Sequence, residues 1–428
     1  MLKILQNILA FFAKRIIKRY HPKVIGITGS VGKTSAKEAI ALVLSTNYRV
    51  RASYKNYNNE IGLPLTIIGI KKSPGKSILK WLWVLGKAKW LTFGFKINYP
   101  EILVLEMAAD KPGDIDYLLK IAPCDVGVLT NISRSHVANY KNMDELIKEK
   151  KKIITGLKDS GTAVLNGDNE LIMKNMQTRA TVMTYGVGEG MVLQANNISL
   201  SIKEEADLTG GINFKVDLMG STVPVFLKNV LAPHLVSAAL AGLAVGHLFE
   251  INLVEAASAL RDFNSPPGRM RIVYGIKNTL LIDDTYNANP ESTLAALKTV
   301  SEIKLTGSGK RYAILGDMLE LGQETDNAHR EVGMKVAELN FNYLLTVGEA
   351  SKNFMAKAAV EAGMDKDCVI SFDNSISAGK FLQNKMEEND LILIKGSQGM
   401  RMEKITKEVM ADPLRAKELL VRQEGKWV

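Results

Sequence analysis

The segment Gly29-Ser30-Val31-Gly32-Lys33-Thr34 has the residue types of a phosphate-binding loop. Its two glycines let backbone amides approach phosphate oxygens, Lys33 supplies a cation near the β and γ phosphates, and Thr34 can ligate magnesium. Ile27 stands where the full Walker pattern has its first glycine, so the match is to the shorter pattern G-x-x-G-K-T. The alternative is a coincidental glycine-rich turn. The ATP-binding residues predicted in this segment are Gly29, Ser30, Gly32, Lys33, Thr34 and Ser35.

Two further polar residues follow apolar runs that have the length of buried strands. Glu106 comes directly after Ile102–Leu105, and His136 closes the turn after Val126–Leu129. A carboxylate is a natural ligand for a hard cation that bridges phosphates, so Glu106 is a candidate magnesium ligand. The alternatives are a solvated strand-end acid and a structural histidine. Their position at strand ends favours a shared site.

Lys150 lies on the apolar side of an expected helix over residues 143–157. It is three residues after Ile147 and four before Ile154, and both of these belong to the apolar stripe. A lysine in this position points inward, where it needs a partner or must lose its charge. Lys148, Lys151 and Lys152 fall mostly off the stripe, as expected of solvated lysines.

These residues must be positioned by a parallel sheet, because short apolar runs alternate with helical stretches from Lys23 onward. In open α/β sheets, ligands bind outside the carboxyl ends of the strands. Residues 191–227 alternate with period two and predict a small antiparallel excursion. The expected strands are Val24–Ile27, Ile102–Leu105, Val126–Leu129, Leu280–Ile282, Tyr312–Leu315 and Leu391–Ile394.

The chain of 428 residues is long enough for two or three domains. Ser265-Pro266-Pro267-Gly268 is the strongest linker signal in the second half and predicts a boundary near residue 267. We expect an α/β chain with three parts. They are a basic amphipathic helix over 1–22, a central P-loop parallel-sheet domain over 23–267, and a C-terminal Rossmann-like α/β domain over 268–428.

The composition of the chain indicates its cellular location and excludes some classes of partner. Two cysteines are too few for a disulfide framework and indicate a reducing cytoplasm. The net charge of +10 has no zinc-finger, RRM or helix-turn-helix signature beside it, so we expect no nucleic-acid partner. The uncharged run within residues 1–22 is too short to span a bilayer. This segment is either an interfacial helix or a helix packed on its own domain.

Several ordered motifs between residues 23 and 428 resemble those of the Mur ligases, and among these the MurF branch. Beside the phosphate loop, Glu106, His136 and Lys150, the motifs are Asn56-Tyr-Asn-Asn-Glu-Ile-Gly-Leu-Pro-Leu65, Glu106-Met-Ala-Ala-Asp-Lys-Pro-Gly-Asp114, Asp283-Asp-Thr-Tyr-Asn-Ala-Asn-Pro290, Gly316-Asp-Met-Leu-Glu-Leu-Gly322 with His329, and Lys395-Gly-Ser-Gln-Gly-Met-Arg-Met-Glu403.

The resemblance implies an ATP-dependent ligase that phosphorylates a peptide carboxylate and joins it to the amine of a dipeptide such as D-alanyl-D-alanine, in peptidoglycan precursor synthesis. ATP and Mg²⁺ are the implied cofactors. The implied catalytic residues are Lys33, Lys150 and His136, and the implied metal ligands are Thr34, Glu106, His136 and a carbamylated Lys150. Asp283, Asp284, Asn287 and Arg269 match nucleotide-contacting positions, and Asn58, Asn59, Lys395 and Ser397 match substrate-facing positions.

Departures from the family pattern leave the substrate open. Only 22 residues precede the phosphate-loop strand, so we expect the usual UDP-binding domain to be absent. Lys152, Ala238 and Gln398 replace a usual glutamate, asparagine and arginine. A Mur-related ligase acting on another carboxylate, such as a pseudomurein-type peptide or a cofactor, and a non-catalytic nucleotide-binding partner protein are the alternatives. The absence of an N-K-x-D motif disfavours a P-loop GTPase.

Residues 71–100 form a basic, aromatic insertion that contains Trp81, Trp83 and Trp90. A mixture of tryptophan and lysine suits a lipid headgroup interface. We therefore consider three roles for residues 1–22 and 71–100: a peripheral contact with the inner face of the membrane, a substitute for the UDP-binding domain that we expect to be absent, or a small core formed by the two segments alone. Otherwise we expect a cytoplasmic monomer.

Overall fold

The structure of the chain is a computed structural model that describes residues 2–54, 57–133, 140–203, 209–305 and 307–423. The chain packs as two compact units, and each is described by itself. The first unit comprises Met1–Ile198, Asn213–Phe226 and His234–Phe263. The second comprises Ser199–Ile212, Leu227–Pro233 and Asn264–Val428.

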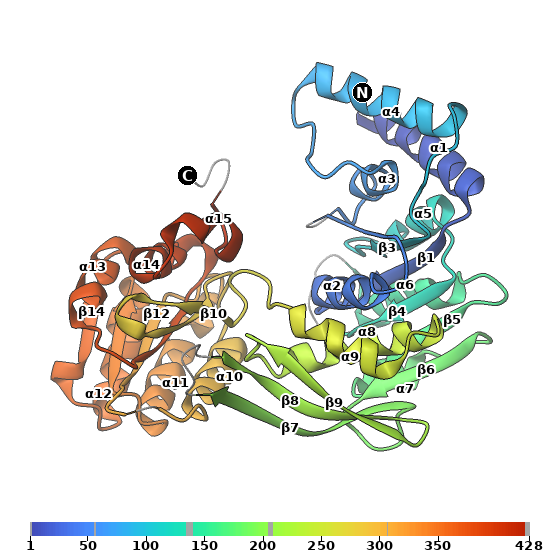
Figure 1. Cartoon of the computed structure of the whole chain (residues 1–428). Helices are drawn as coiled ribbons and strands as arrows, with labels where there is room; N and C mark the ends of the chain where they lie inside the picture. The colour runs from blue at the N-terminus through green and yellow to red at the C-terminus, as the bar shows by residue number, and fades with distance from the viewer. Residues whose placement is uncertain (1, 55–56, 134–139, 204–208, 306, 424–428) are drawn as a thin grey trace. The chain divides into compact units, whose positions relative to one another are not determined.

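The first sheet contains nine strands in the order β2-β3-β1-β4-β5-β6-β7-β8-β9 (Figure 1). From β2 to β7 every neighbouring pair is parallel. β8 and β9 are separated by two residues, a connection that only antiparallel neighbours can make. The strands are β1 Lys23–Thr28, β2 Val50–Ala52, β3 Ile102–Glu106, β4 Val126–Leu129, β5 Thr162–Asn166, β6 Thr181–Gly186, β7 Leu193–Lys203, β8 Thr209–Leu218 and β9 Ser221–Lys228.

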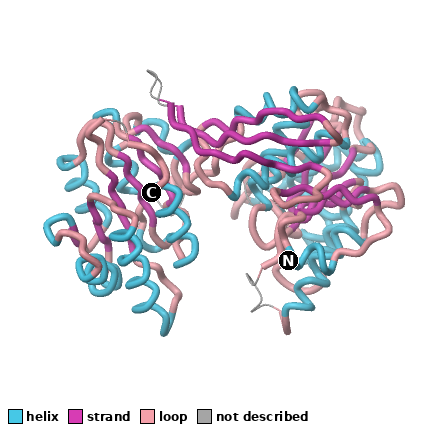
Figure 2. The backbone as a smooth tube through the Cα atoms, turned by 90° about the horizontal axis from the view of Figure 1, so that it is seen from below, coloured by secondary structure: helices cyan, strands magenta, loops and turns pink. Residues whose placement is uncertain are grey.

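Helices cover both faces of the parallel part of this sheet (Figure 2). Side chains start several of them: Ser77, Asn142, Asn169 and Asn252 each accept a hydrogen bond from a backbone amide of the first turn. The helices are α1 Leu2–Tyr20, α2 Lys33–Leu44, α3 Gly62–Ile68, α4 Ile78–Phe93, α5 Asp114–Ile121, α6 Met143–Thr155, α7 Glu170–Asn175, α8 His234–Leu248 and α9 Leu253–Ala259, followed by the 3₁₀ turn η2 Leu260–Asp262.

The second unit is built on a six-stranded sheet in the order β10-β11-β15-β12-β13-β14. β10 is antiparallel to β11 and the other neighbours are parallel. Asn289 caps α10 in a reciprocal capping box with Ser292. The strands are β10 Arg271–Tyr274, β11 Leu280–Asp284, β12 Arg311–Gly316, β13 Tyr343–Val347, β14 Val369–Phe372 and β15 Leu391–Lys395.

The longer helices of this unit are α10 Pro290–Ser301, α11 Thr325–Glu338, α13 Ser375–Lys385 and α14 Glu403–Val409. A π-helical turn, η5 Ser351–Ala356, runs into α12 Lys357–Glu361. The remaining short elements are α15 Ala416–Leu419 and the 3₁₀ turns η3 Ile276–Asn278, η4 Gly322–Glu324, η6 Lys366–Cys368, η7 Gln398–Met400 and η8 Pro413–Arg415.

The structure confirms the expected α/β fold and the six expected strands, several of which are one or two residues longer than predicted. Strands such as Ile102–Glu106, Leu280–Asp284 and Leu391–Lys395 are buried at every position. Continuous apolar runs are typical of strands with both faces covered, which explains why they were visible in the sequence. The period-two segments over 191–227 form β7, β8 and β9.

The N-terminal segment is a helix packed on its own unit. Leu9, Ala13 and Ile16 of α1 are fully buried in the core below it. α4, from the 71–100 segment, lies beside α1 (Figure 1), and the Arg19 guanidinium donates to the carbonyls of Thr92 and Gly94. Among the described residues, no helix combines the length and apolar character needed to cross a membrane.

Candidate active site

The phosphate loop connects the carboxyl end of β1 to the amino end of α2. Gly29 and Gly32 both have positive φ, at 153° and 83°, and Gly32 directly precedes the helix. A Cβ at Gly29 would collide with the Thr130 hydroxyl oxygen, so this position favours glycine on two grounds. Lys33 Nζ donates to the Gly29 carbonyl at 2.7 Å. The loop therefore presents a helix amino terminus and a lysine to the same place, as anion binding requires.

Glu106 lies beside the loop because β3 pairs with β1, with Ile27 opposite Glu106 in the register. Glu106 is 2% exposed, and its carboxylate accepts from the Thr34 hydroxyl at 3.0 Å and from the Asn58 side-chain amide at 3.0 Å. The structure thus brings together three predicted residues from a helix, a strand and a loop. Asn59 lies next in the chain and accepts from the backbone amides of Ile61 and Gly62 at the start of α3. Ser35, in the first turn of α2, is half-buried.

Lys150 is 2% exposed on α6, as its position in the apolar stripe predicted. Its pKa is lowered to about 8, chiefly by burial and also by the nearby charge of Lys33, against the opposing charges of Asp110 and Glu149. Burial also lowers the pKa of Lys33, opposed by Glu106 and Asp110. The two lysines therefore share one electrostatic environment, in which Lys150 is the one that most readily loses its proton.

His136 lies outside the described residues, so its predicted role stays a prediction. In the described part of the chain no three His, Cys, Asp or Glu side chains come close enough to hold a metal ion. The predicted ligand set contains one such described residue, Glu106, together with a hydroxyl and a lysine. A site of this composition needs oxygen ligands from the substrate or from a modified lysine.

The predicted nucleotide-contacting residues of the second unit divide into a buried pair and an exposed pair. Asp283 is fully buried and accepts from the Thr285 and Thr406 hydroxyls, each at 2.9 Å. Burial raises its pKa to about 6, against the opposing effect of those hydroxyl hydrogen bonds. Arg269 and Asn287 are exposed, and the Arg269 guanidinium lies 4.0 Å from the centre of the Tyr286 ring.

Lys395 and Ser397, predicted to face substrate, are buried near the carboxyl ends of β11 and β15. Lys395 Nζ donates to the Asp284 carboxylate at 2.6 Å and to the Asn287 carbonyl at 3.0 Å. The Ser397 hydroxyl accepts from the Leu319 amide at 2.8 Å and donates to the Ala288 carbonyl. Both side chains connect loops at one sheet edge, and a direct substrate contact stays a prediction.

Sequence comparison places this arrangement in a known family. A profile of the Mur ligase middle domain matches residues 27–79 and 88–237, and a profile of the Mur ligase, glutamate ligase domain matches residues 268–398. The UDP-N-acetylmuramoyl-tripeptide–D-alanyl-D-alanine ligase of Bacillus subtilis is 32% identical over 404 residues, which are 94% of this chain and 79% of the relative. The chain belongs to the Mur ligase family.

Solved structures of Mur ligases have the same fold. A MurF ligase from Thermotoga maritima in complex with ADP superposes with a TM-score of 0.71 at 25% identity, covering 94% of this chain and 83% of that one. A MurF from Acinetobacter baumannii gives a TM-score of 0.74 at 25% identity, covering 94% and 80%.

Two buried charged residues that were not predicted from the sequence also support the site of this Mur ligase. Lys37, fully buried one turn after Lys33, donates to the Ser53 carbonyl at 2.8 Å, and the Ser53 hydroxyl accepts from the Glu106 amide. Glu149 is 2% exposed and accepts from the amides of Gly113 and Ile115 at the start of α5. The signal that found Lys150 also exists for Lys37, which follows Ala36 and precedes Ile40 on the buried side of α2.

Lys152, predicted from the sequence to be a departure from the family pattern, is held by two carboxylates. Its Nζ lies 2.5 Å from an Asp116 carboxylate oxygen and 2.7 Å from a Glu149 oxygen. In this Mur ligase the lysine therefore helps to neutralise Glu149, the residue next to Lys150.

Proposed function

We propose that this Mur ligase is an ATP-dependent amide ligase of MurF type, which joins the carboxylate of a muramoyl tripeptide to the amine of D-alanyl-D-alanine. The γ-phosphate of ATP passes to the carboxylate and gives ADP and an acyl phosphate. The amine then attacks the acyl carbon, inorganic phosphate leaves, and the nitrogen loses a proton. The proposal is supported by the names of relatives such as the B. subtilis ligase, of which this chain covers 79%.

The observation that carries the proposal is the contact of Thr34 and Asn58 with the buried Glu106 carboxylate beside the phosphate loop. Lys33 and the amino terminus of α2 supply positive charge where phosphoryl oxygens carry negative charge in transfer. Glu106 is held by donors on both carboxylate oxygens, at 3.0 Å each, so its position is fixed before a nucleotide binds. Asn58 thereby acts as a positioning residue for Glu106.

The residues fit Mg²⁺, because Thr34 and Glu106 offer the hydroxyl and carboxylate oxygens that a hard cation prefers. Thr34, Glu106, His136 and a carbamylated Lys150 would hold it. When bound, the ion neutralises charge on the phosphate oxygens. Free lysine nitrogen is a poor ligand for Mg²⁺, so the assignment of Lys150 depends on its modification.

Lys150 has the chemistry that carbamylation requires. The neutral amine attacks carbon dioxide, a C–N bond forms, and a proton is released to leave a carbamate anion. With the pKa of Lys150 lowered to about 8 by burial, a larger share of neutral amine is present near neutral pH than for an exposed lysine. An anion there would also replace the repulsion between Lys150 and Lys33 by attraction.

We further propose that the protein works as a monomer in the cytoplasm, where ATP is available. Both cysteines of the sequence, Cys124 and Cys368, are free thiols. Arg269 and Asn287 are the best placed of the predicted nucleotide contacts in the second unit, since their side chains are exposed.

ATP turnover measured with and without each substrate tests the proposal. We expect ADP release to need both a muramoyl tripeptide and D-alanyl-D-alanine, and mass spectrometry to find the pentapeptide product. The Lys33→Ala variant serves as the inactive control. ADP release that does not depend on the amine, or a product formed from another carboxylate, would contradict the MurF assignment. Neither result would contradict the assignment of the phosphate-binding loop.

A further inference from the structure

α4 leaves an apolar face exposed on the side opposite its buried residues. Val84, Ala88 and Leu91 are buried against the core, and Trp81 packs there as well. The outward positions follow helical spacing and carry Leu79, Leu82, Trp83, Trp90 and Phe93, which are 79%, 59%, 62%, 47% and 60% exposed. Packing of α1 against α4 therefore accounts for one side of α4 only.

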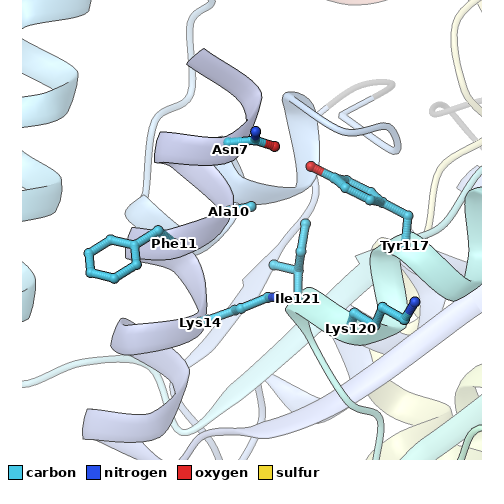
Figure 3. Close-up of a pocket in the computed structure, with 7 residues that line it drawn as sticks. All are labelled: Asn7, Ala10, Phe11, Lys14, Tyr117, Lys120 and Ile121. Carbon is cyan, nitrogen blue, oxygen red and sulfur yellow. The ribbon is translucent and has the colours of Figure 1, made fainter. Parts of the chain in front are cut away.

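α1 has an outward face of the same kind. Ile4, Ile8 and Phe11 are 65%, 38% and 47% exposed, whereas Leu9, Ala13 and Ile16 are buried. Figure 3 shows the Phe11 ring directed away from the groove that α1 forms with α5. Exposed large apolar residues gathered on two neighbouring helices are unusual on a free surface and mark an interaction site.

The two segments that hold these faces also contain the chain's excess of positive charge. Residues 1–23 and 71–100 contain 13 lysines and arginines and no aspartate or glutamate. Removing these 13 from the 55 Lys and Arg leaves 42 against 45 Asp and Glu, so the rest of the chain has a net charge of −3. The basic character indicated by the composition is therefore a local property of these segments.

Lysines border the apolar residues on α4. Lys80 and Lys89 are exposed on opposite sides of the outward face, and Lys87 lies 5.5 Å from the Trp83 ring centre. Long basic side chains beside tryptophan and leucine suit the boundary between lipid headgroups and acyl chains.

A groove of about 340 Å³ between α1 and α5 adds one basic side chain from outside these two segments, Lys120, beside the outward face of α1 (Figure 3). Lys14 and Lys120 line it together with Asn7 and Tyr117. The Tyr117 hydroxyl is buried and has no hydrogen-bond partner among the described residues. Lys14 and Lys120 thus offer donors next to the apolar surface, where headgroup phosphates would lie.

We propose that the outward faces of α1 and α4 dock on an anionic phospholipid surface. The exposed apolar residues enter the headgroup boundary, and the surrounding lysines and arginines bind anionic headgroups. The excess of 13 basic residues without an acid favours an anionic bilayer over a second copy of this chain, whose identical faces would repel each other. The docking is independent of the ligase reaction proposed above.

Vesicle flotation with the full chain and no nucleotide tests the proposal. We expect binding to vesicles of phosphatidylcholine and phosphatidylglycerol at about three to one, weak binding to phosphatidylcholine alone, and release by high salt because screening shortens the reach of the charges. Failure to bind the anionic vesicles, or equal binding to both kinds, would overturn the proposal.

Two sets of variants separate the contributions. The double variant Leu79→Ser, Trp83→Ser should reduce vesicle binding at least tenfold. The control is the double variant Ile376→Ser, Leu414→Ser, which changes exposed apolar positions of the second unit and should leave vesicle binding unchanged. Lys76→Gln, Lys80→Gln and Lys89→Gln together should weaken binding by roughly fivefold per charge. Lys352→Gln, Lys357→Gln and Lys380→Gln are the matched charge control.

Tryptophan fluorescence gives a readout that folding defects do not imitate. Lipids brominated on the acyl chain should quench Trp83 and Trp90 in the wild-type chain, and quenching should fall in the Trp83→Ser and Trp90→Ser variants. Absence of quenching would overturn insertion of α4. The alternative outcome is a dimer in solution that the Leu79→Ser, Trp83→Ser variant disrupts. If such a dimer were found and no vesicle binding were detected, the partner of these faces would be a second copy of the chain, and the bilayer proposal would be wrong.

Discussion

At the residue scale, two inward lysines have different partners. Lys37 donates to the Ser53 carbonyl and pairs with the Glu38 carboxylate. Lys150 has its pKa lowered to about 8 by burial and by Lys33. The apolar stripe in the sequence located Lys150 because its spacing is local. It could not reveal the neighbouring charge of Lys33, which lies more than a hundred positions away in the sequence.

Replacing Lys150 tests the predicted carbamate. We expect Lys150→Ala to lose ligase activity by more than a hundredfold, since it removes both the amine and the anion that forms on it. Formate or acetate should restore part of the activity by supplying a carboxylate in the vacated space, measured as ADP release. Lys148→Ala, at an exposed position of the same helix, is the control. Full activity of Lys150→Ala would refute the assignment.

Asp283 should make stability depend on pH in the direction opposite to most carboxylates. Burial raises its pKa from 3.8 to about 6, so between these values the folded chain holds more protons than the unfolded chain. Stability from this group is therefore present at low pH and is lost as pH rises through that window. The shift corresponds to about 3 kcal/mol.

Asp283→Asn removes that titration. Relative to wild type, the variant should gain up to about 3 kcal/mol of unfolding free energy between pH 4 and pH 7, as measured by urea titration at both values. Placing an amide beside Thr285 and Thr406 has a cost in unfolding free energy that does not depend on pH. This cost cancels when the difference between variant and wild type at pH 4 is compared with the difference at pH 7. A difference between the two proteins that is independent of pH would show that Asp283 titrates normally.

At the scale of elements, the faces of each helix could be read from the sequence only in part. Helical spacing places Leu2, Leu9 and Ile16 on one side of α1, and of these Leu9 and Ile16 are fully buried, whereas Leu2 is 62% exposed. Helical spacing defines a stripe without saying where its partner ends. The composition of residues 71–100 likewise predicted a surface with tryptophans but did not distinguish between them. In the structure Trp81 packs on the core, whereas Trp83 and Trp90 are exposed.

The packing of α1 should contribute strongly to the stability of the first unit. Ile16→Ala removes a fully buried side chain and should cost about 2–5 kcal/mol of unfolding free energy. Ile4→Ala, at a position that is 65% exposed, should cost less than about 0.5 kcal/mol. Urea unfolding of the full chain measures both. Equal costs would mean that α1 is not held by its buried face.

At the scale of the whole molecule, each unit has a core of its own. One cluster of buried residues joins α1, α3, α4, α5 and α6 with the first sheet, and another joins the second sheet with α13 and α14. Separate cores make separate cooperative units the natural expectation.

A core mutation in the second unit should therefore act locally. Ile314→Ala, at a fully buried position of β12, should speed hydrogen exchange of β11, β12 and β15. Exchange in β1 and β3 should stay close to the wild-type rate. Hydrogen-exchange mass spectrometry measures both regions in one experiment. Equal acceleration in both units would show that they unfold together.

The sequence by itself determined the α/β fold, the six expected strands, the phosphate loop and the inward position of Lys150, because each depends on residues close together in the chain. Family resemblance extended this to the reaction. Only the tertiary structure decided that Glu106 accepts hydrogen bonds from Thr34 and Asn58, and that the charge of Lys33 lowers the pKa of Lys150. It also decided that Lys395 forms an ion pair with Asp284, and that α4 buries one side and exposes the other. Those contacts depend on strand order and on helices packing across the sheet, which local spacing does not encode.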